Sequence, residues 1–390
     1  MNIVYVVKNE DKLIKVAQLF SQIYPDLAYV KIPAWDCLPY DNVSPSARIT
    51  GERINSFIKI GINNKPIQLI LITINALLQK NVPFKDFPKS VWDIKESSKI
   101  ILSDFSKNII DSGYRRSGTV MDIGEFAIRG GIVDIFSPNY SYPLRIDFFG
   151  DEVESIKFFD PLTQISIKST NNIKILPISE VLLNEININL FKMNYRKLFG
   201  INASQDELFQ LISQGERPVG LEHWAALFNK NLESLFEILD TRYSFILDSS
   251  FDEFTKMRLD DIADYYTSRD ITFKEAKKNK NIENCYKPVI SESTYINKEL
   301  LDKYLSNRRV LSLSAFKNTT LKNNINGITV PNFWLSRHIN SSDLLNELIK
   351  FVSIKIAGNY KVVITCRSEG SRKVLADQLK KFDFYLEIFN

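Results

Sequence analysis

The residues best suited to chemistry lie at 144–149, where large apolar side chains alternate with polar and aromatic ones. Successive side chains of a strand point to opposite faces, so Arg145, Asp147 and Phe149 share one face and their apolar neighbours share the other. The apolar face is suited to a protein core. The opposite face offers a guanidinium group, a carboxylate and a phenyl ring to solvent, which is typical of a binding surface.

Two glycine-containing turns organise this surface. The pair 150–151 separates two strand-like runs and predicts a tight two-residue hairpin. The pair 130–131 predicts a backbone kink or bulge that carries Arg129 into the following strand. The whole stretch is therefore expected to form a small antiparallel meander. If its strands are neighbours, Arg129 joins Arg145 and Phe149 in one patch.

A second interpretation of these residues is purely structural. Arg145 can pair with Asp134 or Asp147 within the sheet, and Phe149 can pack under a neighbouring loop. In that case the face contributes to stability and not to binding. The sequence leaves both interpretations open, because pairing across strands depends on register.

Residue types that carry catalysis are few and isolated. A phosphate-binding loop requires a Gly-Lys pair, and the sequence contains none. His223 and His338 are the only histidines, and neither stands in a metal or hydrolase motif. The three cysteines, Cys37, Cys285 and Cys366, argue against a disulfide framework or a thiolate metal site. We therefore expect no catalytic residue, cofactor or metal in this chain.

Length and charge indicate a cytoplasmic protein of several domains. The chain has 390 residues, enough for two or three globular units, and its net charge of +4 is too mild to indicate nucleic-acid binding. We interpret the lysine run at 274–280 as a solvated loop or helix end. The first apolar run, 3–7, is too short for a signal peptide or a membrane span, so no membrane association is expected.

Periodicity predicts alternating strands and helices on both sides of the meander. Continuous apolar runs of strand length are typical of buried parallel strands, and apolar residues three and four apart are typical of amphipathic helices. Polar residues before such helices are expected to cap them. The predicted elements are strands at 2–7, 67–74 and 361–366, helices capped at Ser44, Ser204, Ser342 and Ser368, and a loop at 318–327.

Short motifs span most of the first 165 residues, and a thinner set follows. The motifs lie at 35–41, 44–45, 73–79, 113–115, 124–136, 145–149, 159–161 with Gln164, 220–224, 227–228 and 235–236. In these residues the chain resembles the amino-terminal region of bacterial transcription-repair coupling factors, which is similar to part of the excinuclease protein UvrB.

The resemblance implies a multidomain α/β fold. A degenerate helicase-like, doubly wound α/β domain is expected from residues 1–90 and 178–295 together. An inserted strand-rich α+β domain is expected at 91–177, and a separate small α/β domain at 296–390.

The resemblance also implies a recruiting function. In the family, the inserted domain binds the excinuclease protein UvrA, and the arginine pair and aromatic residue of its motif correspond to Arg129, Arg145 and Phe149. An arginine fork pairs with a carboxylate through two hydrogen bonds, and a phenyl ring fills an apolar pocket. With the family considered, the binding interpretation leads over the structural one.

Catalysis in this family belongs to regions that follow the matched part. RNA polymerase and DNA contacts, and an ATP-dependent translocase, lie in parts of the full-length protein that this chain does not include. The chain is thus expected to bind UvrA constitutively and to be non-catalytic. Two other functions remain open: a divergent UvrB-type DNA-binding ATPase, and a purely structural scaffold.

Overall fold

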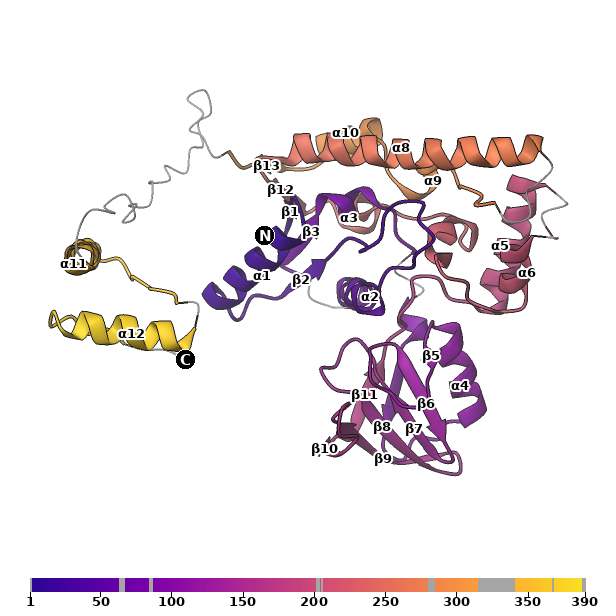
Figure 1. Ribbon diagram of the computed structural model, residues 1–390, viewed down its shortest axis with the longest axis horizontal. Helices are drawn as coiled ribbons and strands as arrows, with labels where there is room; N and C mark the ends of the chain where they lie inside the picture. Colours follow the sequence, from indigo (N-terminus) through magenta and orange to yellow (C-terminus); the bar gives the residue numbers. More distant parts are fainter. Residues whose placement is uncertain are drawn as a thin grey trace. The chain divides into compact units, whose positions relative to one another are not determined.

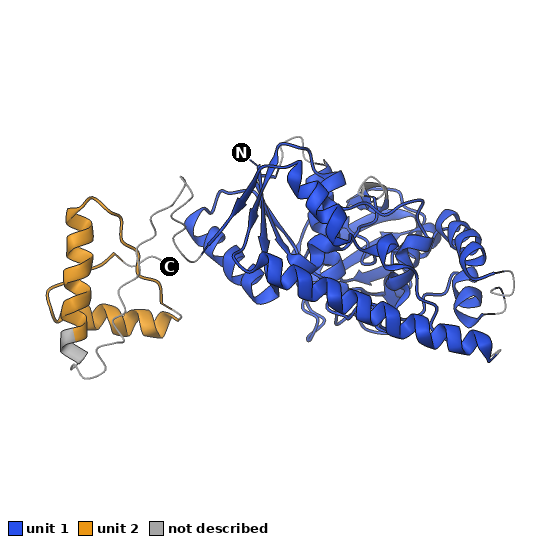
Figure 2. Cartoon of the chain, turned by 90° about the horizontal axis from the view of Figure 1, so that it is seen from above, with its two compact units in different colours: residues 1–315 blue, residues 316–390 orange. Residues whose placement is uncertain are grey.

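The computed structural model describes residues 2–62, 67–83, 87–200, 204, 206–279, 285–314, 341–366 and 368–387. The chain divides into two compact units, residues 1–315 and 316–390 (Figure 2).

A five-stranded sheet forms the body of the first unit (Figure 1). All of its strand pairs are parallel. The strand order β13-β12-β1-β3-β2 places β1 in the middle, so that strands from the start and the end of the unit lie on either side of it. The strands are β1 (Asn2–Val7), β2 (Tyr29–Ile32), β3 (Leu69–Thr73), β12 (Tyr243–Leu247) and β13 (Val310–Ser312).

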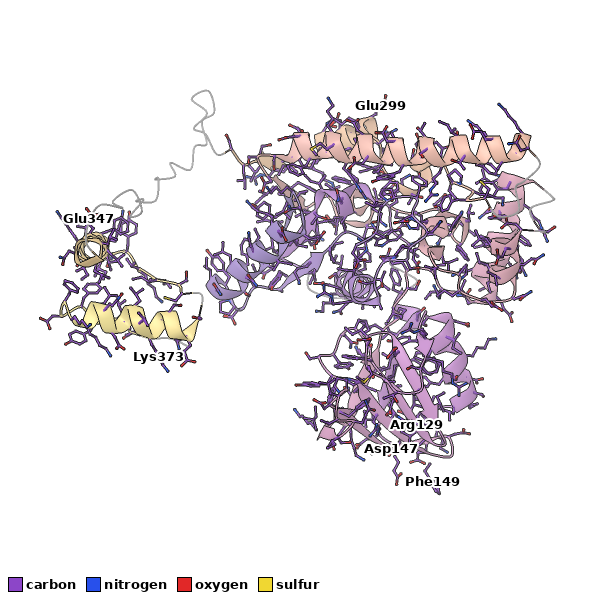
Figure 3. All side chains as sticks on the ribbon, in the orientation of Figure 1. Arg129, Asp147, Phe149, Glu299, Glu347 and Lys373 are labelled. Atoms are coloured by element: carbon purple, nitrogen blue, oxygen red, sulfur yellow. The ribbon has the colours of Figure 1, made fainter. Side chains whose placement is uncertain are left out.

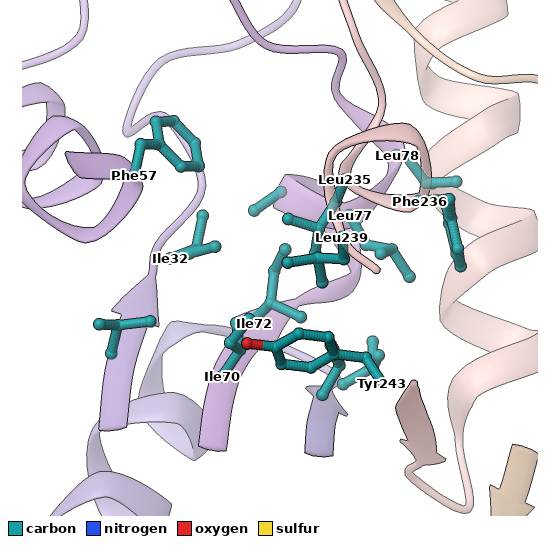
Figure 4. Close-up of a cluster of buried hydrophobic side chains, with 14 of the residues drawn as sticks. Ile32, Phe57, Ile70, Ile72, Leu77, Leu78, Leu235, Phe236, Leu239 and Tyr243 are labelled. Carbon is teal, nitrogen blue, oxygen red and sulfur yellow. The ribbon is translucent and has the colours of Figure 1, made fainter. Parts of the chain in front are cut away.

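Both faces of this sheet are covered, which explains why its central strands are apolar on both sides. Ile70 of β3 enters a large buried cluster to which α2 (Ala47–Ile62) contributes (Figure 4). The next residue, Leu71, points to the other face and packs with α1 (Glu10–Ile23). The strands predicted at 2–7 and 67–74 are thereby confirmed as β1 and β3.

Helix α2 begins later than the sequence predicts, and Ser46 rather than Ser44 caps it. The Ser46 hydroxyl accepts a hydrogen bond from the Ile49 amide at 3.4 Å. Ser44 instead accepts from the Gly220 amide at 2.8 Å and donates to Glu222 at 2.7 Å. The predicted cap was wrong because Ser44 has partners that lie far away in the sequence.

A similar shift occurs at α6 (Glu207–Ser213). Asp206, and not Ser204, accepts from the Phe209 amide at 3.2 Å. Helix α6 packs with α5 (Glu185–Phe199) and the 3-10 turn η3 (Leu221–Leu227) in a buried cluster separate from the parallel sheet. The other helices of this unit are α3 (Ile74–Leu78), α7 (Leu235–Ile238), α8 (Phe251–Lys278), α9 (Ser291–Thr294) and α10 (Lys298–Ser306), with the 3-10 turn η1 (Phe87–Ser90).

The predicted meander is part of a second, mostly antiparallel sheet in the same unit (Figure 1). Its strand order is β10-β9-β8-β7-β6-β5, and only the β5–β6 pair is parallel. The strands are β5 (Arg115–Arg116), β6 (Glu125–Arg129), β7 (Ile132–Ile135), β8 (Leu144–Phe149), β9 (Glu152–Phe159) and β10 (Ser166–Ser169).

One face of this sheet carries its own core. Ile146 of β8 lies in a buried cluster with Phe105 of α4 (Leu102–Asp111). The chain enters this region through β4 (Trp92–Lys95) and leaves through β11 (Asn172–Ile175), and these two strands pair antiparallel with each other. Entry and exit therefore lie side by side, the arrangement that an insertion into another fold requires.

Close contacts fix this strand-rich region against α2. The Thr50 hydroxyl donates to the Ile178 carbonyl oxygen at 2.6 Å. The fully buried Arg53 guanidinium bonds the Glu180 carboxylate and the Asn81 side chain. Because these partners flank the points where the chain enters and leaves the region, they hold its orientation on the body.

The second unit contributes two helices in its described part, α11 (Ser341–Ala357) and α12 (Glu369–Lys380). Ser368 caps α12 as predicted, accepting from the Ser371 amide at 3.2 Å. The strand predicted at 361–366 is not formed, and this segment is irregular. Val363 within it is exposed, because no described strand of this unit lies alongside to pair with it. The loop predicted at 318–327 lies outside the described residues.

The chain is thus a mixed α/β protein with one parallel and one mostly antiparallel sheet. The last domain was predicted to start at residue 296, whereas the division of the chain falls after residue 315. The reason is that β13 is hydrogen-bonded to β12 and completes the parallel sheet. The boundaries at 90/91 and 177/178 stay predictions.

We predict that Gly51→Ala destabilises the protein, because a Cβ at Gly51 would stand 2.2 Å from the Cβ of Pro138. Overpacking of this kind typically lowers the free energy of unfolding by about 2 kcal/mol. Gly61 of the same helix has nothing within 4 Å of its Cβ position. Gly61→Ala should therefore raise the free energy of unfolding by roughly 0.5–1 kcal/mol. Urea titrations of both variants measure this, and equal effects would contradict the assigned contact.

Candidate partner-binding surface

Strand register gathers the predicted residues on the outer face of the antiparallel sheet. Asp134 of β7 lies directly opposite Arg145 of β8. Arg129 of β6 lies opposite Ile132 of β7, which is two residues before Asp134 and therefore on the same face of the strand. The strands that carry Arg129 and Arg145 are not direct neighbours as assumed, because β7 lies between them, but both arginines bond Asp134 of β7. Both side chains project to the face opposite the core, as the alternation in the sequence indicates.

A single carboxylate joins the two arginines. Asp134 accepts from Arg145 Nε at 2.7 Å and from Arg145 Nη2 at 2.9 Å. It also accepts from Arg129 Nη2 at 2.7 Å. The Asp134 side chain is only 1% exposed, so its charge is removed from water and depends on these donors. We call Asp134, Arg129 and Arg145 the arginine cluster.

The two arginines differ in how accessible their N–H donors are to a partner. Arg145 also donates from Nη1 to the Gln164 carbonyl oxygen at 3.2 Å, and its guanidinium lies 4.6 Å from the centre of the Phe159 ring. Its hydrogen bonds to Asp134 raise its pKa, and 21% of its side chain is exposed. Arg129 is 54% exposed and bonds Asp134 through one nitrogen. Arg129 is the more accessible donor.

Phe149 stands at the end of β8 with 81% of its surface exposed. Figure 3 shows its side chain extending away from the strands at the end of the sheet where Arg129 and Asp147 also lie. The two-residue hairpin predicted at 150–151 is confirmed, since Phe149 pairs with Glu152. The ring is therefore presented by a short, constrained turn and not by a long loop.

The glycine pair at 130–131 forms a hairpin turn, which corrects the predicted kink or bulge. Gly130 has a φ of +62°, a conformation that favours glycine. A Cβ on Gly131 would stand 2.6 Å from the Phe148 carbonyl oxygen, so only glycine allows β7 and β8 this approach. Register shifts in this sheet lie instead between Asp147 and Phe148, where β8 pairs with β9, and between Ser166 and Lys168, where β10 pairs with β9.

The structural interpretation left open by the sequence holds for only part of this face, and the binding interpretation stays a prediction. Arg145 does pair with Asp134 within the sheet, as the structural interpretation requires. Phe149 does not pack under a loop. Asp147 bonds the Ser155 hydroxyl and Lys157, and these bonds outweigh its burial and lower its pKa.

The partly buried Cys37 thiol and the buried His223 imidazole lie close together, but their pKa shifts do not favour a nucleophilic thiolate. The Cys37 sulfur lies 3.9 Å from His223 Nε2, but burial raises the pKa of the Cys37 thiol to about 12. Burial also lowers the pKa of His223, whose Nε2 lies 3.1 Å from the Val43 carbonyl oxygen. A protonated thiol beside a neutral imidazole has little nucleophilic character at neutral pH. His338 lies outside the described residues.

After the carboxyl ends of β1 and β2, where open α/β sheets often bind ligands, polar groups of the chain bond one another. Asn9 caps α1 by accepting from the Lys12 amide at 3.1 Å. The partly buried Glu10 carboxylate accepts from the Ala34 amide at 2.8 Å. No group of metal-binding side chains occurs among the described residues, and none of the described helices has the length and apolarity needed to span a membrane.

Sequence reasoning missed the turn at 160–165 as part of this surface. It exposes Leu162 and Ile165, and it contacts the arginine cluster through Gln164. An available signal was the Asp-Pro pair at 160–161, since aspartate and proline favour a turn at this point.

The strand-rich region is similar to a known protein family. Residues 93–181 match the family described as the UvrB interaction domain. This match begins in β4 and ends shortly after β11, so it covers the antiparallel sheet and the arginine cluster.

Known proteins with similar sequences cover most of the chain. The transcription-repair-coupling factor of Rickettsia prowazekii is 30% identical over 366 residues, covering 93% of this chain and 31% of that protein. The one from Rickettsia bellii is 32% identical over 267 residues, covering 66% and 24%. The one from Haemophilus influenzae is 26% identical over 353 residues, covering 89% and 29%. The resemblance to transcription-repair coupling factors is confirmed, and the chain spans about a quarter to a third of these relatives.

We predict that Asp134→Asn destabilises the fold, because it leaves the Arg145 guanidinium without its charged partner. Loss of charge-assisted hydrogen bonds at a largely buried carboxylate costs about 2 kcal/mol. Asp93→Asn, at an exposed position of β4, is the control and should leave the melting temperature unchanged. Thermal unfolding followed by circular dichroism measures both variants. Equal melting temperatures for the two would contradict the role of Asp134.

We predict that burial of His223 makes stability depend on pH. Its pKa is lower in the folded state than its ordinary value of 6.5, so the unfolded chain binds the proton more readily. Its contribution to the free energy of unfolding is therefore complete above pH 6.5 and is lost as the pH falls below it. His223→Gln can still donate to the Val43 carbonyl oxygen but does not titrate. The difference in melting temperature between the parent chain and this variant should change between about pH 7.5 and 5.5, and a constant difference would refute the prediction.

Proposed function

We propose that this chain recruits the excinuclease protein UvrA, as the amino-terminal module of a transcription-repair coupling factor. The observation that carries the proposal is Phe149, a large aromatic side chain exposed at 81% on a constrained hairpin beside the arginine cluster. Burying such a ring in a pocket of a partner is favourable in free energy relative to leaving the ring in water. The match of residues 93–181 to the UvrB interaction domain supports the same conclusion.

The three residues have different roles in this proposal. Phe149 is the apolar anchor. Arg129 is the charged contact, because it is half exposed and retains donors beyond its bond to Asp134. Arg145 positions the others, because its nitrogens already bond Asp134 and Gln164.

We also propose that the parallel-sheet body is a degenerate helicase-like domain that acts in the cytoplasm without catalysis or cofactor. The absence of a Gly-Lys pair supports this, since a phosphate loop cannot be built without it. Glu10 supports it as well, because it places a carboxylate where nucleotide phosphates would approach α1. We further propose that the contacts with RNA polymerase and DNA expected for coupling factors are made outside the residues described above.

A binding titration against purified UvrA tests the recruiting function. Phe149→Ala should weaken binding by about 2 kcal/mol, since it removes the anchor. Arg129→Ala should weaken binding by about 1 kcal/mol, because an exposed charge contributes less. Ile186→Ala, similarly exposed but on α5, should bind like the parent chain. Unchanged affinity in Phe149→Ala would contradict the proposed surface.

Turnover of ATP with and without duplex DNA tests the non-catalytic proposal. We expect no ATP hydrolysis above the rate measured without protein. The chain has no phosphate-binding loop, and the Glu10 carboxylate would repel the phosphate groups of ATP. DNA-stimulated hydrolysis by the purified chain would establish the ATPase alternative instead. The measurement is independent of partner binding, so that the two proposals are judged separately.

A further inference from the structure

A rigid apolar turn stands beside the arginine cluster and contributes little to the core. Residues 160–165 connect β9 to β10, and within them Leu162 is 80% exposed and Ile165 is 67% exposed. Single exposed apolar residues are ordinary on protein surfaces. Two on one short turn, next to a candidate docking face, form a patch of the kind that proteins use for association.

The turn is held in one conformation by its own polar groups. Asp160 Oδ1 accepts from the Leu162 amide at 2.9 Å and from the Thr163 amide at 2.8 Å. The Gln164 side-chain amide donates to the carbonyl oxygens of Pro161 at 2.7 Å and Val120 at 3.2 Å. Since the backbone that carries Leu162 is already ordered, docking it would lose less conformational entropy than docking a flexible loop.

The turn is continuous with the arginine cluster. The Gln164 carbonyl oxygen accepts from Arg145, and Arg145 shares the Asp134 carboxylate with Arg129. Two cations around one carboxylate leave a surplus positive charge in the arginine cluster, and the carboxylate of Asp147 on the same face is paired with Lys157. The face therefore presents positive charge with an apolar group on either side of it.

This pattern favours a protein partner over a polyanion. The segment 91–177 contains 12 acidic and 10 basic residues, so the region lacks the concentration of basic side chains that phosphate groups of nucleic acid or lipid require. A protein surface with two apolar depressions and an acidic group between them is complementary to the face.

We propose that the turn at 160–165 is a second apolar anchor, which inserts Leu162 and Ile165 into the same partner protein that receives Phe149. This inference rests on the proposed function and adds a second contact point to it. With two anchors on either side of the arginine cluster, the partner is held in one orientation, whereas one ring alone would allow rotation about the contact.

The test is a titration of the complete chain against purified UvrA, with Leu162→Ser, Ile165→Ser and Phe149→Ala. Leu162→Ser and Ile165→Ser should each raise the Kd about tenfold, as expected for truncation of a buried anchor. Ile186→Ser, 73% exposed on α5, is the matched control and should leave the Kd unchanged. All four variants should keep the melting temperature of the parent chain, since the altered side chains are exposed.

The outcomes separate this inference from the proposed function. If the parent chain does not bind, both are overturned. If Phe149→Ala weakens binding while Leu162→Ser and Ile165→Ser bind normally, the second anchor is refuted and the proposed function stands. Sedimentation velocity provides one further outcome: loss of self-association in Leu162→Ser, with an unchanged Kd for the partner, would assign the turn to contacts between copies of this chain and refute its role as an anchor.

Discussion

The surface depends on one buried carboxylate that serves two arginines. Asp134 is removed from water, so it requires charged donors, and the β6–β7–β8 register supplies them from Arg129 and Arg145. Because both guanidinium groups must reach the same carboxylate, the outer face of three neighbouring strands is held in one arrangement. A change in register of one residue would turn Asp134 to the core and separate the two arginines.

The rest of the fold holds this face in place by fixing the segments that connect the antiparallel sheet to the body. The paired entry and exit strands, β4 and β11, close the strand-rich region at its base. The buried bonds of Arg53 to Glu180 and of Thr50 to Ile178 then hold that base on α2. At the far end, two-residue hairpins leave Phe149 little freedom. The backbone that carries Phe149 is therefore held in place from the core of the body to the end of β8.

Patterns with a short period were predicted well, and features that depend on distant partners were not. Alternation at 144–149 assigned the faces of β8 correctly, because the period of a strand is local. Ser44 was wrongly assigned as a cap because its actual partners, Gly220 and Glu222, are remote in the sequence. The 361–366 run has strand propensity, but a strand forms only where another lies beside it to pair. The pairing of Arg145 with Asp134 was foreseen as one of two options, and only the observed register decided between them.

The two arginines of the cluster look alike in the sequence but differ in the structure. One positions neighbouring groups, and the other is accessible to a partner. An arginine whose three nitrogens each bond a protein atom keeps fewer of its five N–H donors for a partner, and its removal acts largely through the groups it positions. Arg145 is of this kind, whereas Arg129 keeps donors directed to solvent. The same distinction applies to the two regions of the first unit. Around α1 the polar groups of the body bond one another, while the antiparallel sheet leaves a cation and a ring exposed. The proposed binding surface therefore lies on the sheet, and the body contributes by holding the sheet in place.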